Sequence, residues 1–342
     1  MLQRPRRNRA SVAVRSMLRE THLAPHHLVL PLFVQAGQNL ESPISSMPGQ
    51  ARLSIDRLLD KAREAARLGV RGVALFPAID DSLKDPRGRE SQNPEGLLQQ
   101  TVRELKKHVP ELCVITDVAL DPYSSDGHDG VLIDGRIDND ATLPLLAAMA
   151  VNQARAGADI VAPSDMMDGR VAAIREGLDE AGFTQVGILS YCVKYASAFY
   201  GPFREALDSA PRGGDKKTYQ MDPGNLREAE REIELDEAEG ADMLMVKPAT
   251  IYADVIRYMR DRTALPIAAY HVSGEYAMLK AAAQNGWLNY DACLLEALLG
   301  LRRAGADLIF TYAALDAARL LQRSEPARTE QASAAPRGAN PR

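Results

Sequence analysis

The sequence predicts an α/β fold, a (β/α)8 TIM barrel with an extended N-terminal arm. Three observations favour it: apolar runs of strand length recur along the chain, helical segments separate them, and they number about eight. A doubly wound open sheet is the alternative architecture. It is less favoured because no G-x-G-x-x-G follows the first run, and because about eight units suit closure into a ring.

The chain opens with a segment, residues 1–27, that lacks strand and core patterns and carries a cluster of arginines near its start. We expect this segment to form an arm for subunit contacts. The catalytic barrel is expected to span residues 28–322. Residues 323–342 are rich in Ala, Pro, Arg, Ser and Glu, a composition typical of a disordered tail.

Each expected strand is a short apolar run bounded by polar or turn residues. In chain order the runs are Leu28–Val34, Gly72–Phe76, Leu112–Thr116, Asp159–Ala162, Val186–Tyr191, Asp242–Val246, Pro266–Tyr270 and Asp307–Thr311. The segments between them have helical periodicity, and Ser54 is placed to cap the helix that follows it. A repeated Gly-Ala-Asp at 157–159, 240–242 and 305–307 puts glycine where a helix must end before the next strand.

Composition excludes several classes of protein. The 342 residues carry a formal net charge of -5, which argues against a nucleic-acid-binding surface. No apolar stretch approaches the roughly 20 residues that span a bilayer, so no membrane partner is expected. The N-terminus lacks the apolar centre of a secretory signal, and we therefore expect a cytoplasmic protein.

Two lysines, Lys194 and Lys247, follow the fifth and sixth apolar runs. In a closed barrel these strands are neighbours about 4.8 Å apart, and active sites gather at the carboxyl ends of the strands. Burial disfavours the ammonium form, and each positive charge lowers the pKa of the other amine. Such a pair can form Schiff bases with carbonyl compounds. The alternative is that both lysines extend their charged ends into solvent.

Other polar side chains also follow predicted strands. Asp117, Ser164, Ser273 and Tyr312 follow the third, fourth, seventh and eighth runs. Hydroxyls at strand ends can hold a carboxylate, although many are satisfied by nearby backbone.

The loop at 117–130 concentrates aspartates around turn residues, including Asp121 and Asp129. Carboxylate oxygens suit Mg²⁺ better than zinc, whereas a solvated acidic turn is the plain alternative.

A second loop, residues 199–219, is too long and too polar for a tight turn. Its cations include Arg204 and Lys216, so it could close as a lid over an anionic substrate. An exposed loop with ordinary surface charge is the alternative.

Four segments together resemble a known family. They are residues 162–169, residues 194–204 with Lys194, residues 245–248 with Lys247, and residues 272–278 with Ser273. On these motifs the chain, from about Arg7 to Leu321, resembles the 5-aminolevulinate dehydratase, or porphobilinogen synthase, family. The resemblance implies a hydro-lyase that condenses two 5-aminolevulinate molecules to porphobilinogen, with loss of two waters, in tetrapyrrole (haem) biosynthesis.

The resemblance also implies residue roles. Lys247 would form the Schiff base with the substrate that becomes the propionate side, and Lys194 with the substrate that becomes the acetate side. Ser273 and Tyr312 would hold the first carboxylate, and Arg204 and Lys216 in the lid would hold the second. Asp117, Asp121, Asp129 and Ser164 would orient the substrate amine or handle protons.

The zinc-dependent branch of the family has three cysteines at positions that match Ala119, Asp121 and Asp129. The chain lacks them, so it resembles the zinc-independent, magnesium-stimulated branch, and no catalytic zinc is expected. A monovalent cation in the aspartate loop remains open. The resemblance further implies an allosteric Mg²⁺ at Glu232 and a homo-octamer, whereas the charge run around Glu232 alone is typical of a solvated helix face.

Two alternatives to this function stay open from sequence. A class I aldolase needs only one imine-forming lysine and a phosphate site after the last strands. A catalytically silent barrel kept as an oligomeric scaffold would have no need for paired amines. Borohydride trapping would separate the three, with imines at both lysines, at one, or at neither.

Overall fold

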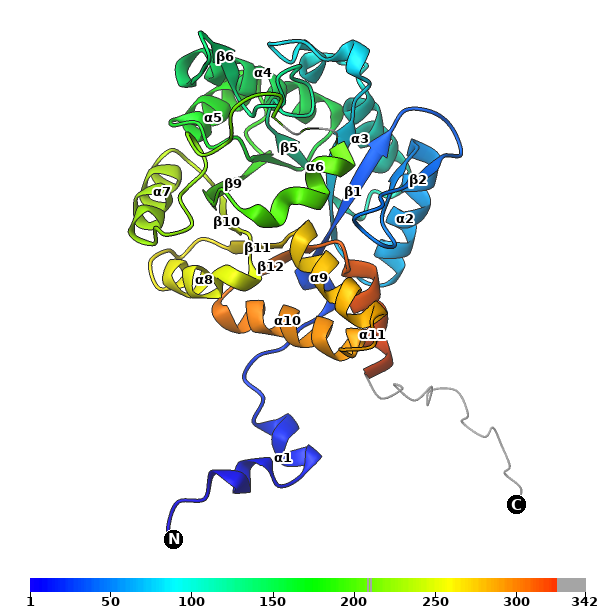
Figure 1. The fold of residues 1–342 in the computed structure, drawn as a ribbon, viewed down its shortest axis with the longest axis vertical. Helices are drawn as coiled ribbons and strands as arrows, with labels where there is room; N and C mark the ends of the chain where they lie inside the picture. The colour runs from blue at the N-terminus through cyan, green and yellow to red at the C-terminus, as the bar shows by residue number, and fades with distance from the viewer. Residues whose placement is uncertain (208, 210, 325–342) are drawn as a thin grey trace, which may run out of the picture.

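A computed structural model describes residues 1–207, 209 and 211–324 of the chain. Its centre is a closed ring of parallel strands (Figure 1), in the order β12-β11-β10-β9-β8-β5-β4-β1 with β12 paired to β1. The strands of the ring are β1 (Leu28–Gln35), β4 (Gly72–Ala78), β5 (Cys113–Val118), β8 (Ile160–Pro163), β9 (Gly187–Lys194), β10 (Met243–Lys247), β11 (Ile267–His271) and β12 (Leu308–Thr311). The predicted TIM barrel is confirmed, since every predicted run forms one of these strands.

The ladders of the ring differ in length. β1 and β4 pair from Val29 and Gly72 to Gln35 and Ala78. By contrast, β8 and β9 pair at Ile160–Gly187 and Val161–Ile188, and β1 and β12 pair at Leu28–Ile309 and Val29–Phe310. These two short ladders divide the ring into a first half-barrel, β1, β4, β5 and β8, and a second half-barrel, β9 to β12.

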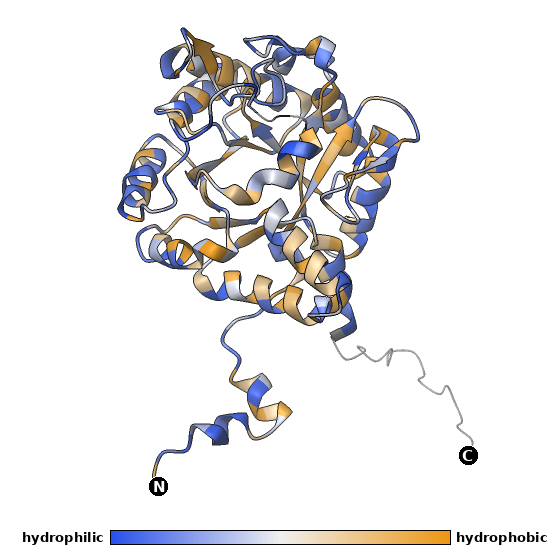
Figure 2. Cartoon of the chain, viewed as in Figure 1, coloured by the Kyte–Doolittle hydropathy of each residue, from blue (hydrophilic) through white to orange (hydrophobic). Residues whose placement is uncertain are grey.

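Helices surround the ring with their apolar faces inward. They are α2 (Ile55–Arg67), α3 (Leu97–His108), α4 (Asn139–Ala156), α5 (Arg170–Glu180), α7 (Arg227–Ala238), α8 (Ala253–Arg260), α9 (Ser273–Gln284), α10 (Tyr290–Ala304) and α11 (Ala314–Ser324). Figure 2 shows hydrophobic strands inside and hydrophilic outer helix faces. In α2, for example, Leu58, Ala62 and Ala65 recur at helical spacing and are fully buried.

The three Gly-Ala-Asp junctions behave alike. A glycine stands at the end of each helical segment: Gly157 after α4, Gly240 in the turn after α7, and Gly305 after α10. Their φ angles are 107°, 101° and 129°, a region that favours glycine. Each following aspartate accepts a hydrogen bond from the first residues of the preceding strand: Asp159 from the Val114 N–H at 2.8 Å, Asp242 from Ile188 at 2.7 Å, and Asp307 from Ile267 at 2.9 Å. The repeat therefore links neighbouring strands where they enter the barrel.

Two small hairpins were not predicted from the sequence. β2 (Glu41–Pro43) and β3 (Ala51–Leu53) form an antiparallel pair that joins the end of β1, and β6 (Val131–Ile133) pairs with β7 (Arg136–Asp138). Ser54 occupies the N-cap position of α2, as predicted, and its carbonyl accepts from the Leu58 N–H at 2.9 Å, but its side chain forms no capping bond. Its hydroxyl accepts from the Leu40 N–H at 2.9 Å and donates to the Leu40 carbonyl at 3.2 Å, so it joins the hairpin segment instead.

The N-terminal segment extends away from the barrel (Figure 1). Its short elements, a 3-10 helix (Pro5–Arg9) and α1 (Val12–Met17), contain no buried residue. No helix within the described ranges is long and apolar enough to cross a membrane. Of the predicted tail, residues 323–342, Arg323 and Ser324 belong to α11, and residues 325–342 lie outside the described residues.

Candidate active site

The two predicted lysines stand side by side at the carboxyl end of the barrel. Lys194 is the last residue of β9 and Lys247 the last residue of β10, and the two are register partners across that parallel pair. Each strand therefore includes its lysine. Both side chains are buried, with 5% and 6% of their surface exposed. Neither lysine extends freely into solvent.

Lys247 is enclosed by aromatic rings. Its Nζ lies 4.7 to 5.2 Å from the centroids of Tyr191, Tyr200, Phe203 and Tyr270. Burial among these rings and, after it, the positive charge of Lys194 lower its pKa to about 7, against the opposing charges of nearby aspartates. A large fraction of this amine is therefore neutral, and nucleophilic, near pH 7.

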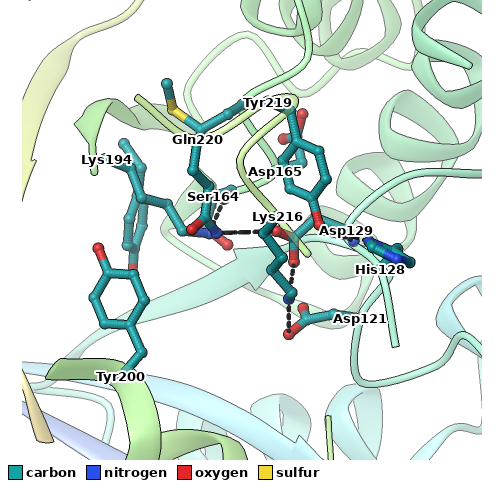
Figure 3. A network of polar contacts seen from close by, with 12 residues as sticks. Asp121, His128, Asp129, Ser164, Asp165, Lys194, Tyr200, Lys216, Tyr219 and Gln220 are labelled. Carbon is teal, nitrogen blue, oxygen red and sulfur yellow. Dashed lines mark hydrogen bonds and ion pairs between the residues drawn. The ribbon is translucent and has the colours of Figure 1, made fainter. Parts of the chain in front are cut away.

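Lys194 has polar neighbours instead (Figure 3). Its Nζ donates to the Ser164 carbonyl and lies 3.7 Å from the Asp129 carboxylate. Because Ser164 follows β8, this contact crosses the short ladder between the two half-barrels. The two lysines thus occupy equivalent strand positions but different electrostatic surroundings.

Asp121 and Asp129 share a third buried cation, Lys216 (Figure 3). The Lys216 Nζ lies 3.3 Å from Asp121 and 3.0 Å from Asp129. Burial opposes the charge on Lys216, but the two carboxylates raise its pKa overall. Burial likewise opposes the charge on Asp129, yet Lys194 and Lys216 hold its pKa below the usual range. The centre of the site is therefore a charged network.

Asp117 lies in β5 and takes no part in the ion pairs of this network. Burial and, after it, the nearby charge of Asp121 raise its pKa to about 7, against the opposing charges of Lys247 and Lys194. The nearby Ser164 hydroxyl also opposes the rise. For Asp121, burial raises the pKa and Lys216 opposes the shift. Asp117 can therefore hold or release a proton near neutral pH.

The segment 199–219 begins with a 3-10 helix (Ala198–Tyr200) and α6 (Gly201–Leu207), which lies across the mouth of the barrel (Figure 1). The Phe203 N–H donates to the Ser273 hydroxyl oxygen at 3.1 Å, and this hydroxyl lies 3.4 Å from the Phe199 carbonyl that accepts from it. The Tyr200 hydroxyl donates to the Lys247 carbonyl at 3.1 Å. The lid segment is thus bonded to residues at the ends of β10 and β11.

The remaining predicted ligands lie around this mouth. Tyr312 follows β12, and its hydroxyl pairs with that of Tyr270 at 3.0 Å. Arg204 lies on α6, is half-buried, and its guanidinium forms no hydrogen bond or ion pair with any residue of the described ranges. The structure places Lys216 against Asp121 and Asp129, so the two lid cations do not have equivalent surroundings.

Glu232 lies beside the site, on α7. It lines a cavity of about 1170 Å³ together with Asp168, Glu228 and Asn225, and Lys194 and Lys247 do not line this cavity. Burial raises the pKa of Glu232 to about 7; the neighbouring acids add to the rise and Arg170 opposes it. His128, Tyr219 and Gln220 form part of the wall between this cavity and Asp129.

Sequence reasoning missed several residues of the site. Tyr200 and Phe203 enclose Lys247, Gln220 donates to Asp129 at 3.4 Å, and the His128 imidazole bonds to Tyr219 at 3.1 Å. The aromatic residues between 199 and 203 were a usable signal, because large apolar side chains are unusual in an exposed loop. Gln220 and Tyr219 offered no such signal.

A barrel that brings several amines and carboxylates together over one end belongs to the enzymes that act on carbonyl compounds through lysine. A family model described as delta-aminolevulinic acid dehydratase matches residues 2–320. The chain therefore belongs to the delta-aminolevulinic acid dehydratase family. It is a hydro-lyase, a porphobilinogen synthase of tetrapyrrole biosynthesis, and the aldolase and silent-scaffold alternatives are set aside.

Individual relatives agree with this assignment. The chain is 58% identical over 323 residues to the chloroplastic delta-aminolevulinic acid dehydratase of Selaginella martensii, covering 94% of this chain and 77% of the relative. It is 54% identical over 320 residues to the enzyme of Bradyrhizobium diazoefficiens, covering 93% and 91%. A crystal structure of the Toxoplasma gondii ME49 enzyme with its product porphobilinogen has a TM-score of 0.93 and 52% identity, covering 97% of this chain and 96% of that one.

These relatives correct one prediction. The expectation of a cytoplasmic protein is contradicted by the relatives from Selaginella martensii, Physcomitrium patens, Glycine max and Chlamydomonas reinhardtii, which are described as chloroplastic. The sequence argument failed because a modest net charge and a missing secretory pattern are shared by proteins of several compartments.

Proposed function

We propose that this protein condenses its two 5-aminolevulinate molecules through Schiff bases on both Lys247 and Lys194. Each neutral amine adds to a ketone carbon, and the carbonyl oxygen leaves as water, so two waters are released. The new carbon–carbon and carbon–nitrogen bonds then displace the lysines as free amines. The register pairing of the two buried lysines is the observation that carries this proposal.

Lys247 would form the first imine, with the substrate that becomes the propionate side, because its pKa of about 7 leaves it partly neutral. Ser273 and Tyr312, which follow the adjacent strands β11 and β12, would hold this substrate's carboxylate. The Ser273 hydroxyl, which donates to the Phe199 carbonyl, can rotate and donate to a bound carboxylate instead. Its oxygen would still accept from the Phe203 N–H. Binding would then reinforce lid closure.

Lys194 would bind the substrate that becomes the acetate side. Arg204 supports this assignment, since its guanidinium has no ionic partner in the described ranges and can receive a carboxylate as a fork. Lys216 would contribute its positive charge from the same lid. Its bonds to Asp121 and Asp129 mean that the carboxylate would share this cation with them.

The aspartates and Ser164 would handle protons and the substrate amine. Asp129 is held as a carboxylate by two lysines, so it suits an ammonium or amine group. Asp117 has a pKa of about 7 and suits transfer of protons at neutral pH. The nearby Ser164 hydroxyl would orient this carboxyl group.

We also propose that the reaction needs no catalytic zinc. The positions of the family's cysteines are Ala119, Asp121 and Asp129, and no thiolate stands there. A monovalent cation does not fit the aspartate loop, because the Lys216 ammonium already lies between Asp121 and Asp129. Lysine supplies the positive charge that a metal would otherwise provide.

An allosteric Mg²⁺ at Glu232 fits the residues present. The half-buried Glu232 is repelled by the nearby carboxylates of Asp236, Asp168 and Glu228, and oxygen donors suit a hard cation. No group of three or more His, Cys, Asp or Glu is arranged as a metal site in the part of the chain described, so the ion would keep most of its waters. When bound, it would supply charge that stabilises the ionised Glu232.

The proposed assembly is a homo-octamer in which the arm wraps a neighbouring barrel. The arm supports this because Val12, Met17 and Leu18 are 69%, 83% and 52% exposed and contact no core of their own chain. Exposed apolar residues on an extended segment are typical of a subunit contact.

Porphobilinogen formation by metal-stripped protein tests the reaction and the metal proposal together. Protein would be assayed with zinc, magnesium, potassium or no ion added. Product without zinc, with a rise in magnesium, is the expected result. Activity restored by zinc alone would contradict the zinc-independent proposal.

A further inference from the structure

Glu275 is a buried carboxylate that none of the proposed roles uses. It is the third residue of α9, only 1% exposed, and forms no ion pair with a basic side chain in the described ranges. Burying an unpaired carboxylate is costly unless hydrogen bonds satisfy it. The contacts of Glu275 therefore indicate what the residue does.

Backbone N–H groups from two different places surround this carboxylate. One oxygen accepts from Thr250 at 2.6 Å and from Ile251 at 3.3 Å. The other accepts from Val272 at 2.7 Å and from Ala249 at 3.5 Å. Glu275 is thus held by charge-assisted hydrogen bonds, the strong kind.

Only part of this arrangement is helix capping. The bond from the Val272 N–H is the reciprocal half of a capping box, and Val272 has no side-chain acceptor for the other half. The bonds to residues 249–251 do nothing for α9. They tie the start of α9 to the loop that follows Lys247.

These bonds therefore join the ends of two neighbouring strands. Lys247 ends β10, three residues before Thr250, whereas Ser273 follows β11 and lies two residues before Glu275. The separation of these strand ends determines how far the imine nitrogen lies from the hydroxyl that receives a carboxylate. A misplacement of about 1 Å can cost roughly a hundredfold in rate.

We propose that Glu275 is a positioning residue that sets the distance between the Lys247 amine and the Ser273 hydroxyl. The site thereby selects 4-oxo acids, whose ketone and carboxylate are separated by two methylenes. This inference rests on the proposed function, since it assumes an imine at Lys247 and a carboxylate at Ser273. Glu275 acts through both groups and touches neither substrate nor reacting atoms.

Two probes of equal length test the proposal: 4-oxopentanoate, a keto acid, and 2-pentanone, which has a methyl group in place of the carboxylate. Each ketone would form an imine at Lys247 with loss of water, and borohydride would add hydride to the imine carbon. Mass spectrometry of the Lys247 peptide measures the secondary amine. The half-saturating concentration is determined for each probe.

Glu275→Gln should raise the half-saturating concentration of 4-oxopentanoate about tenfold or more, the effect of losing hydrogen bonds to a charged group. The value for 2-pentanone should not change, because that probe needs no distance to Ser273. Glu275→Asp is the second variant: it can keep the Val272 bond but is too short to reach residues 249–251, so the same selective loss is expected. Glu104→Gln, on the outer helix α3 with partners on that helix, is the matched control.

Three results would overturn the inference: equal losses for both probes, no loss for either, or a Glu275→Asp variant that behaves as wild type. Equal losses would mean that the residue only supports the fold or the lysine. If the wild-type protein traps neither probe at Lys247, the proposed function itself fails, and this outcome is distinct from the others.

Discussion

At the scale of single residues, the two lysines show how different surroundings give the same type of side chain two different roles. Lys194 and Lys247 are register partners at the ends of adjacent strands. Lys194 contacts a carbonyl and a carboxylate, whereas aromatic rings enclose Lys247. Burial among the rings disfavours the ammonium form of Lys247.

The pH dependence of imine formation follows from the pKa of Lys247. Since this pKa is lowered to about 7, the amine is protonated and unreactive below that pH, and becomes nucleophilic as pH rises through it. Trapping of 4-oxopentanoate at Lys247 by borohydride should therefore increase with a midpoint near pH 7. A midpoint near the ordinary lysine value of about 10.4 would contradict this reading.

The charge of Lys194 contributes to that low pKa, so its removal should be visible at Lys247. In Lys194→Met the positive charge is lost, the ammonium of Lys247 is less disfavoured, and the trapping midpoint should move to higher pH. Peptide mass spectrometry over a pH series measures the shift. An unchanged or lower midpoint would show that the two amines do not interact.

At the scale of elements, the lid and α9 approach each other backbone to backbone. A Cβ added to Gly274 would lie 2.5 Å from the Phe199 carbonyl oxygen and 2.9 Å from the Phe199 Cα. Such distances leave no room for a methyl group. Glycine at this position lets Phe203, four residues further along the lid, reach Lys247 and the Ser273 hydroxyl.

Gly274→Ala should displace the lid and lower turnover, by about a hundredfold if the shift reaches 1 Å. Steady-state porphobilinogen formation measures the loss, and circular dichroism checks that the barrel remains folded. Gly201→Ala is a matched control on the lid itself, because a Cβ there meets nothing within 4 Å. Equal effects in both variants would argue against the close contact as the cause.

The elements also show where sequence reasoning works and where it fails. Buried parallel strands read as continuous apolar runs, so all strands of the ring were predictable. β2, β3, β6 and β7 are three residues long with mixed exposure, too short for any alternation to stand out. Ser54 precedes a helix as a cap would, but a hairpin competes for its hydroxyl.

The residues of the site also include some that could be predicted from the sequence and some that could not. Lys194, Lys247, Ser273 and Tyr312 were predictable because each follows or ends a strand, and strand order determines their neighbours. The bonds of Lys216 to Asp121 and Asp129 were not, since they join residues 95 and 87 positions apart through the path of a long loop. Lid conformations follow from tertiary packing rather than from periodicity.

At the scale of the whole molecule, the arm and the barrel are structurally separate. None of the residues in the arm's short elements is buried, so the barrel core does not depend on them. Deletion of residues 1–20 should therefore leave a folded barrel while reducing the size of the assembly. Light scattering after size exclusion measures that size, and an unchanged assembly would contradict the proposed role of the arm.

The two half-barrels contribute different chemistry to the site. Asp117 lies in β5, and Asp121, Asp129 and Ser164 follow strands of the first half, whereas Lys194, Lys247, Ser273 and Tyr312 belong to the second. The acids and the amines therefore meet only while both short ladders are closed. At the β8–β9 ladder, the bond from Lys194 to Ser164 adds a link between the halves.

Because the ladders of the ring differ in length, neighbouring strand pairs should differ in local stability. Native-state hydrogen exchange should reveal this difference. Amides at 160–161 and 187–188, on the short β8–β9 ladder, should exchange with deuterium sooner than amides along β1 and β4. Exchange in the first and second halves should then be correlated within each half and independent between them. Uniform protection around the ring would mean that the barrel opens as one unit. If the two short ladders open first, the paired lysines separate from the aspartates before either half-barrel unfolds. Catalysis would then be lost at a lower denaturant concentration than secondary structure.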